Sequence, residues 1–173
     1  MPEPPTAIGD AVRAAREYLR AHPDEARYTD SAATARLEAG LLVRVEGPGG
    51  AALITDMPAS IGGREEAPSP GWFLRAGHAA CVTTLIGMRA AEEGVVLSRL
   101  EVVVESQSDD RGILDAADDI PAGPLSTSVR IVLAADGVPH DRLREIAEWG
   151  AVHCPVHDAV RRAVPVSVEV SVG

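Results

Sequence analysis

Hydrophobic and polar positions alternate with different periods along the chain, and each period predicts a type of element. Residues 6–21 place apolar side chains at helical spacing, which predicts an amphipathic helix. Residues 31–46 alternate with period two, which predicts a half-buried strand in which Gly40 marks a bulge or a turn. The Gly-Pro-Gly-Gly run at 47–50 predicts a turn into a second strand over 51–55, so this region reads as a hairpin.

A long stretch in the middle of the chain is apolar on nearly every side. It predicts a helix from about 72 to 93, ended by Gly94, and a helix without a polar face is typical of a buried element. Residues 95–105 and 126–133 alternate again and predict two strands that pair antiparallel. The Asp-, Gly- and Pro-rich residues 106–124 between them predict a long solvated excursion.

The last third of the chain predicts two helices and a strand. Pro139 opens a helix through about residue 151, Pro155 opens a shorter one over about 155–163, and residues 164–172 alternate almost perfectly as a strand. Strands grouped between helices, without a regular strand–helix alternation, predict an α+β fold with a mainly antiparallel sheet.

Composition and charge narrow the classes of function. The 173 residues suffice for one domain with a substantial core, which must be aliphatic because aromatic residues make up only 3%. A net charge of −10, with no lysine, argues against nucleic acid or an anionic membrane as a partner. The N-terminus shows no signal-peptide pattern, so we expect a cytoplasmic protein in which cysteines are free, catalytic or metal-bound.

Only two cysteines are present, and their local settings differ. Pro155 favours a helix start directly after Cys154, so backbone N–H groups and the helix dipole are expected to favour a Cys154 thiolate. His153 and His157 flank it and would add to this effect when protonated. Cys81 lies mid-helix, one turn after His78, where nothing local activates it. For both thiols the alternative is an ordinary buried apolar cysteine.

The histidines near the cysteines raise a second hypothesis. His78-x-x-Cys81 and Cys154-x-x-His157 together supply the two Cys and two His ligands of a tetrahedral zinc site, provided that the fold brings the segments together. The primary expectation is nevertheless that the protein holds no metal and no cofactor.

The two cysteine motifs also carry a family resemblance. The pattern of Pro70, seven residues and His78-Ala-Ala-Cys81, followed by Cys154-Pro-Val, resembles the OsmC/Ohr family of thiol-dependent hydroperoxide reductases. The order of elements resembles that family too, over about residues 31–173. Residues 1–30 would then be an additional N-terminal helix.

The resemblance implies a fold and a reaction. Family members are intertwined homodimers whose mainly antiparallel sheets wrap long central helices. By resemblance, Cys81 is the peroxidatic cysteine, which attacks an organic hydroperoxide and becomes a sulfenic acid, and Cys154 resolves it to a Cys81–Cys154 disulfide. A dithiol such as a lipoylated protein would then reduce the disulfide.

One position departs from the family pattern. A family Glu that pairs with an Arg lies ten residues before the peroxidatic cysteine, where this chain has Gly71. Arg64 is the candidate for the family Arg. The change at Gly71 motivates an alternative, a binding protein of the same fold without efficient peroxidase activity. The predicted substrate pocket is lined by Trp72, Phe73, His78 and Met88, although core or dimer packing explains such residues as well.

Overall fold

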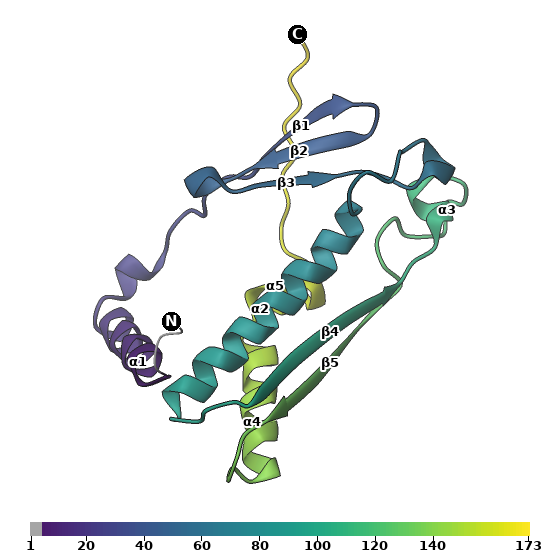
Figure 1. The fold of residues 1–173 in the computed structure, drawn as a ribbon. Coiled ribbons are helices and arrows are strands. Elements are labelled where there is room, and N and C mark those ends of the chain that lie inside the picture. Colours follow the sequence, from purple (N-terminus) through teal and green to yellow (C-terminus); the bar gives the residue numbers. More distant parts are fainter. Residues whose placement is uncertain (1–4) are drawn as a thin grey trace. The chain divides into compact units, whose positions relative to one another are not determined.

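Helix α2 (Pro70–Glu92) is 23 residues long and is drawn in teal in Figure 1. It ends where the sequence predicts, because Gly94 takes a left-handed φ of +70° and the Val95 N–H bonds the carbonyl of Ala90 at 2.8 Å. None of the helices within residues 5–173 combines the length and hydropathy needed to cross a bilayer.

The computed structural model describes residues 5–173, whose contacts group into two compact units. Residues 5–10, 78–104 and 128–173 make up the first, which we call the dithiol unit because it contains both cysteines. Residues 11–77 and 105–127 make up the second, which we call the meander unit. The first turns of α2 therefore belong to the meander unit and the rest of the helix to the dithiol unit.

The meander unit is built on a three-stranded antiparallel sheet in the order β1-β2-β3 (Figure 1). Its strands are β1 (Thr34–Ala39), β2 (Leu42–Glu46) and β3 (Ala52–Thr55). The strand predicted over 31–46 is therefore two strands, and of the two alternatives at Gly40 the structure shows the turn. The sheet is poorly covered within the chain, since every β1 residue is exposed and Leu37 is exposed to 67%.

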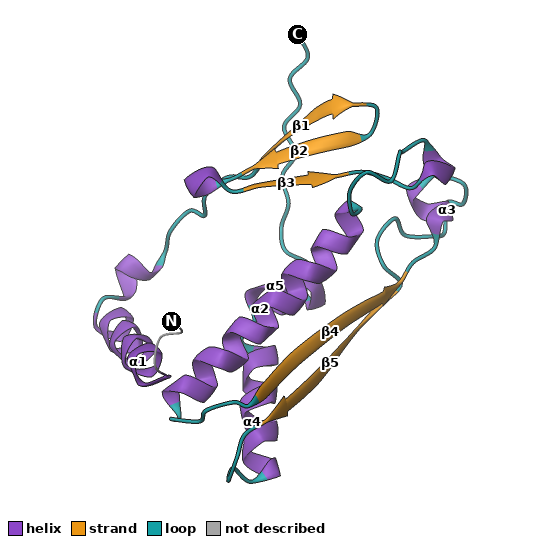
Figure 2. Ribbon diagram, viewed as in Figure 1, coloured by secondary structure: helices purple, strands orange, loops and turns teal. Residues whose placement is uncertain are grey.

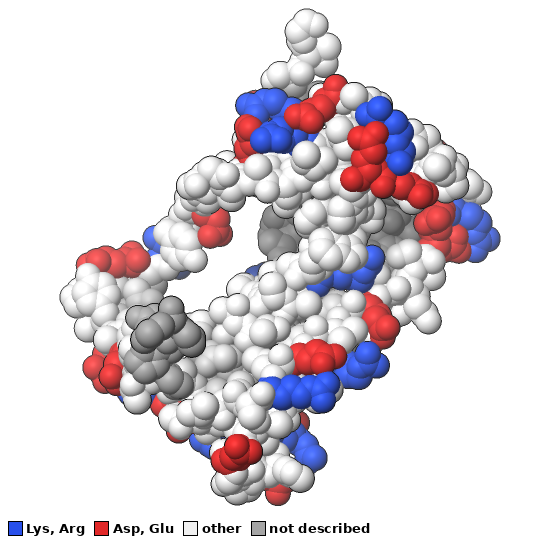
Figure 3. Space-filling model, in the orientation of Figure 1, with Lys and Arg blue, Asp and Glu red and all other residues white. Residues whose placement is uncertain are grey.

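Helices and short turns complete this part of the chain. Helix α1 (Pro5–Ala21) confirms the predicted N-terminal helix. The remaining short elements are the 3₁₀ turns η1 (Pro23–Ala26), η2 (Pro48–Gly50) and η3 (Ala59–Ile61), together with helix α3 (Asp110–Ile113). Figure 3 shows arginines and acidic side chains intermixed on the face in view, and pairs such as Arg36–Glu46 at 2.8 Å join opposite charges.

Strands β4 (Arg99–Gln107) and β5 (Ser126–Ala134) form a separate two-stranded sheet, as the alternation predicts. They run antiparallel, since the Ser98 N–H bonds the carbonyl of Ala134 and the Leu125 N–H bonds that of Gln107, both at 2.8 Å.

The hydrophobic core of the dithiol unit lies between α2 and α4 (His140–Val152). Its buried members are Val82, Ile86, Ala90, Ile146, Ala147 and Cys154. Gly150 lets the two helices approach closely, because a Cβ at this position would stand 2.8 Å from the Ile86 backbone nitrogen. The packing of α4 on α2 therefore helps to place Cys154, which lies four residues after Gly150 and just beyond the end of α4.

The predicted helix after Pro155 is present as α5 (Pro155–Arg161). The strand predicted over 164–172 is absent, and Figure 2 draws these residues as loop. Its alternate valines (Val164, Val166, Val168, Val170 and Val172) are exposed to between 43% and 92%. The prediction fails within one chain because a strand forms only when it has a partner for its backbone hydrogen bonds.

Candidate active site at two cysteines

Cys154 is the residue that caps helix α5. Its backbone is extended, Pro155 occupies the first helical position, and Sγ accepts a hydrogen bond from the His157 N–H at 3.3 Å. This geometry confirms the predicted helix start. The side chain is 0% exposed and belongs to the hydrophobic core, so it has no direct access to solvent.

Cys81 lies on α2, at the edge of the same core and half-buried. It packs against the core cluster that contains Cys154, close enough for Cys81 to raise the pKa of the Cys154 thiol. Both cysteines are free in this structure. Two thiols that are 73 residues apart in the sequence are therefore neighbours in the dithiol unit, which no local motif could establish.

The low pKa expected for the Cys154 thiol is wrong, because its surroundings act in the opposite direction. Burial raises the pKa of the Cys154 thiol above its usual value of 9.0, and the hydrogen bond with Cys81 raises it further. The backbone N–H groups of His157 and Val156 act in the opposite direction but do not outweigh these effects. Cys154 therefore keeps its proton, contrary to the expectation from its helix-cap position alone.

Two histidines stand beside the thiols. His78 is 2% exposed, and its Nε2 lies 3.0 Å from Nδ1 of His157, with the rings tilted by 47°. Burial lowers the pKa of His78, and the charge of His157 lowers it further.

The zinc hypothesis placed these histidines and cysteines around one ion. The four side chains do come together, but the two ring nitrogens engage each other. Throughout residues 5–173, no group of three or more His, Cys, Asp or Glu side chains is arranged to hold a metal ion. The zinc hypothesis therefore gains no geometric support.

Arg64, the predicted catalytic arginine, belongs to the meander unit. Its loop is organised by Asp56, a buried carboxylate that accepts N–H bonds from Met57, Arg64 and Glu66 at 2.8–3.1 Å. Burial tends to raise the pKa of Asp56, but these hydrogen bonds and the charge of Arg64 together lower it. The Arg64 side chain pairs with Glu66 at 3.1 Å, and its role toward Cys81 stays a prediction.

Gly71, where the family pattern has Glu, opens onto a cavity of about 320 Å³ in the meander unit. A Cβ on Gly71 would stand 3.7 Å from Nη1 of Arg75, an ordinary contact distance. Arg75 also donates to the Ser106 hydroxyl at 3.2 Å. The other side chains at the cavity are mostly apolar, among them Ile61 and Leu74. An arginine thus stands beside the space that the missing side chain leaves.

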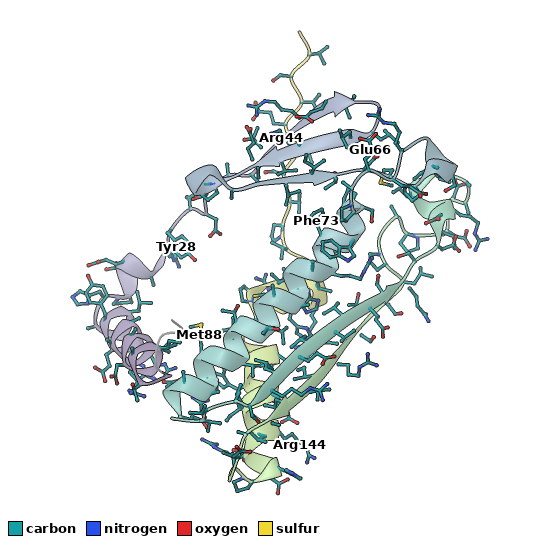
Figure 4. The ribbon with its side chains drawn as sticks, in the orientation of Figure 1. Tyr28, Arg44, Glu66, Phe73, Met88 and Arg144 are labelled. Atoms are coloured by element: carbon teal, nitrogen blue, oxygen red, sulfur yellow. The ribbon has the colours of Figure 1, made fainter. Side chains whose placement is uncertain are left out.

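The predicted pocket residues are spread along α2. Trp72, 47% exposed, contacts the edge of Phe73 with ring centroids 5.0 Å apart, and it lines a cavity with Arg75. Figure 4 shows Phe73 and Met88 near opposite ends of the helix. At 1.5 Å per residue these two lie about 22 Å apart along its axis. The role of Trp72, Phe73, His78 and Met88 in a substrate pocket stays a prediction.

Sequence reasoning missed two features of this region. Arg75 has no role among the sequence-based predictions, and only the structure brings it to Ser106 and to the cavity. His157 was considered as a zinc ligand, whereas the structure pairs it with His78. The signal for that pair was in the sequence, since each histidine lies three residues from a cysteine, in opposite directions.

Comparison with known proteins adds a family to this geometry. Residues 63–169, more than half of the chain and including both cysteines, match the family model described as OsmC-like protein. The chain belongs to the OsmC-like protein family. None of the curated proteins matches the sequence of this OsmC-like protein significantly.

Solved structures share the fold of this OsmC-like protein at low identity. An OsmC-like protein from Mycoplasma pneumoniae superposes with a TM-score of 0.67 at 14% identity, over 79% of this chain and 91% of that one. An organic hydroperoxide resistance protein OsmC from Legionella pneumophila gives 0.57 at 21% identity, over 78% and 91%. The organic hydroperoxide resistance protein OhrB of Bacillus subtilis gives 0.51 at 20% identity, over 78% and 93%.

Proposed function

We propose that this OsmC-like protein is a thiol-dependent peroxidase that reduces organic hydroperoxides through Cys81 and Cys154. The proximity of the two free thiols within one unit is the observation that carries the proposal. The Cys81 thiolate attacks the peroxide O–O bond, an alcohol leaves, and Cys81 becomes a sulfenic acid. Cys154 then attacks that sulfur, the S–S bond forms, and the hydroxyl leaves as water with the Cys154 proton.

The substrate and the reductant follow from the family and from the chemistry. The solved relatives named organic hydroperoxide resistance proteins favour an organic hydroperoxide as the oxidant. Reduction of the disulfide requires two electrons from a dithiol, for which a lipoylated protein is our candidate. We place the reaction in the cytoplasm, where the reducing environment keeps such thiols free.

The proposal is tested by intact mass spectrometry after treatment with cumene hydroperoxide and without added reductant. We expect the reduced protein to lose two hydrogen atoms, about 2 Da, as one disulfide forms. Cys154→Ser should instead gain one oxygen, as a sulfenic acid on Cys81. An unchanged mass in the native protein, or the same loss in the Cys154→Ser variant, would rule out the mechanism.

We also propose that the protein works as an intertwined homodimer. The exposed valines of residues 164–172 keep the alternation of a strand, and pairing with a sheet edge of a second copy would bury them. Sedimentation should give a dimer that weakens when residues 164–173 are removed, and a monomeric native protein would contradict the proposal.

A second candidate function is small-molecule binding by the same fold. The cavity at Gly71 favours it, because about 320 Å³ of mostly apolar space next to the Arg75 guanidinium suits a small ligand. This candidate predicts slow peroxide consumption and a ligand that is retained in native mass spectrometry. An empty cavity together with fast turnover would exclude it.

A further inference from the structure

Two side-chain pairs join helix α2 to the start of α5. Cys81 meets Cys154, and His78 meets His157 at 3.0 Å between ring nitrogens. Within each segment the histidine lies three residues from the cysteine, and the two segments run in opposite directions. The cysteine pair and the histidine pair therefore lie next to each other, and both connect helix α2 to the first turn of α5.

The histidine pair has one buried member, His78. His78 is 2% exposed, so its ring nitrogen depends on a partner inside the protein. In a neutral pair one ring donates its N–H and the other accepts it. Removal of the His157 ring leaves the buried Nε2 of His78 without this partner.

His157 interacts with a member of each pair, Cys154 and His78. Its backbone N–H donates to Cys154 Sγ at 3.3 Å, while its ring reaches His78 on α2. Helix α5 is only seven residues long, none of them is buried, and the chain beyond it has no secondary structure. The short helix therefore depends on anchors at its first turn to keep Cys154 in place.

We propose that the hydrogen bond between His78 and His157 holds Cys154 in position to attack oxidised Cys81. This inference rests on the proposed peroxidase function. The two histidines are positioning residues for the resolving step, in which Cys154 Sγ attacks the sulfenic sulfur, the S–S bond forms, and the S–O bond breaks. The departing hydroxyl takes the Cys154 proton and leaves as water. Oxidation of Cys81 by the peroxide, which precedes this step, does not require the histidine pair.

A single-turnover experiment separates the two steps. Reduced protein is mixed with one equivalent of cumene hydroperoxide, quenched over time, and analysed by peptide mass mapping with dimedone as the trap for sulfenic acid. We expect His157→Ala to oxidise Cys81 at the native rate but to form the disulfide about 10- to 100-fold more slowly. Trapped sulfenic acid should accumulate, and excess peroxide should drive Cys81 to sulfinic acid.

Three further variants control for indirect effects. His157→Asn keeps a polar nitrogen or oxygen near the position of Nδ1 and should restore most of the rate, whereas His157→Phe keeps the ring without a partner atom and should stay slow. His153→Ala is the matched control, because His153 also adjoins Cys154 but bonds the Trp149 carbonyl at 2.8 Å and stacks on its ring. It should form the disulfide at the native rate.

The outcomes discriminate between the proposals. Native-rate disulfide formation in both His157→Ala and His157→Phe overturns the positioning role. Equal slowing of Cys81 oxidation and of resolution also overturns it, because the histidine would then act on the whole site. If His157→Ala does not fold, the contrast between His157→Phe and His157→Asn decides. Native protein that forms neither sulfenic acid nor disulfide refutes the peroxidase function itself.

Discussion

Gly150 is the position where a single methyl group should disturb both the core and the thiol pair. A Cβ there would stand 2.8 Å from the backbone nitrogen of Ile86 and 3.0 Å from its Cα. Backbone atoms in the middle of helix α2 cannot rotate away as a side chain can, so Gly150→Ala must push α4 and α2 apart. Bringing the methyl group to ordinary contact requires a shift of roughly 1 Å.

Two opposing effects determine how much the free energy of unfolding falls in Gly150→Ala. Overpacking of a core lowers the free energy of unfolding by about 1–3 kcal/mol, and the better helix propensity of alanine returns about 1 kcal/mol. The difference is about 0–2 kcal/mol, and we expect a net destabilisation near its middle, about 1 kcal/mol, or roughly 2–4 °C in Tm for a chain of this size. Because Cys154 lies one turn after Gly150, the same shift should slow disulfide formation between Cys154 and Cys81.

Thermal unfolding followed by circular dichroism, at one fixed protein concentration, measures the loss of stability in Gly150→Ala. Gly87→Ala is the matched control, because Gly87 lies on α2 with no atom within 4 Å of its Cβ position. That change should raise stability by about 0.5–1 kcal/mol through helix propensity alone. If Gly150→Ala proves as stable as Gly87→Ala, the close approach of the two helices is not tight and the reasoning fails.

Two other predictions follow from the site. Gly71→Glu should fold and gain about 1 kcal/mol, because a Cβ at this position would meet only Arg75 Nη1 at 3.7 Å and Ser69 Oγ at 3.8 Å and because the change adds an acid to the first turn of α2. Peroxide consumption should also rise, and a lower Tm would contradict the geometry. Stability should fall as pH drops below about 6.5, because burial lowers the pKa of His78 and the unfolded chain then binds the extra proton. The free energy of unfolding, measured in urea between about pH 5 and 8, should depend less steeply on pH in His78→Asn than in the native protein. An equal pH dependence in the two proteins would exclude the effect.

The sequence predicts those elements whose determinants are local. An apolar run followed by Gly94 suffices for α2, and Pro155 suffices for the start of α5. It fails where a second segment decides the outcome. Residues 164–172 alternate as a strand, yet a strand needs a neighbouring edge, and no strand within residues 5–173 pairs with them. Gly40 left a bulge and a turn equally open, and the pairing of β1 with β2 resolves it as a turn.

The site follows the same division. The position of Cys154 at a helix start predicted backbone N–H groups near its thiol, and the His157 N–H does bond Cys154 Sγ, but the predicted direction of the pKa shift was wrong. The backbone dipole is a local effect, and complete burial together with Cys81 as a neighbour outweighs it. The His78–His157 pair and the Arg75–Ser106 bond are contacts between distant segments, which spacing alone could not distinguish from metal ligation or from solvent exposure.

Burial also assigns the order in which the two thiols react under the proposed function. A hydroperoxide must reach the sulfur that it oxidises, and Cys154 is 0% exposed whereas Cys81 is half-buried. A thiol that keeps its proton is a poor nucleophile, so the raised pKa of Cys154 holds it back until oxidised Cys81 presents a sulfur with a leaving group. Under the proposed function we therefore expect Cys81 to meet peroxide first, an expectation that rests on the difference in exposure between the two thiols.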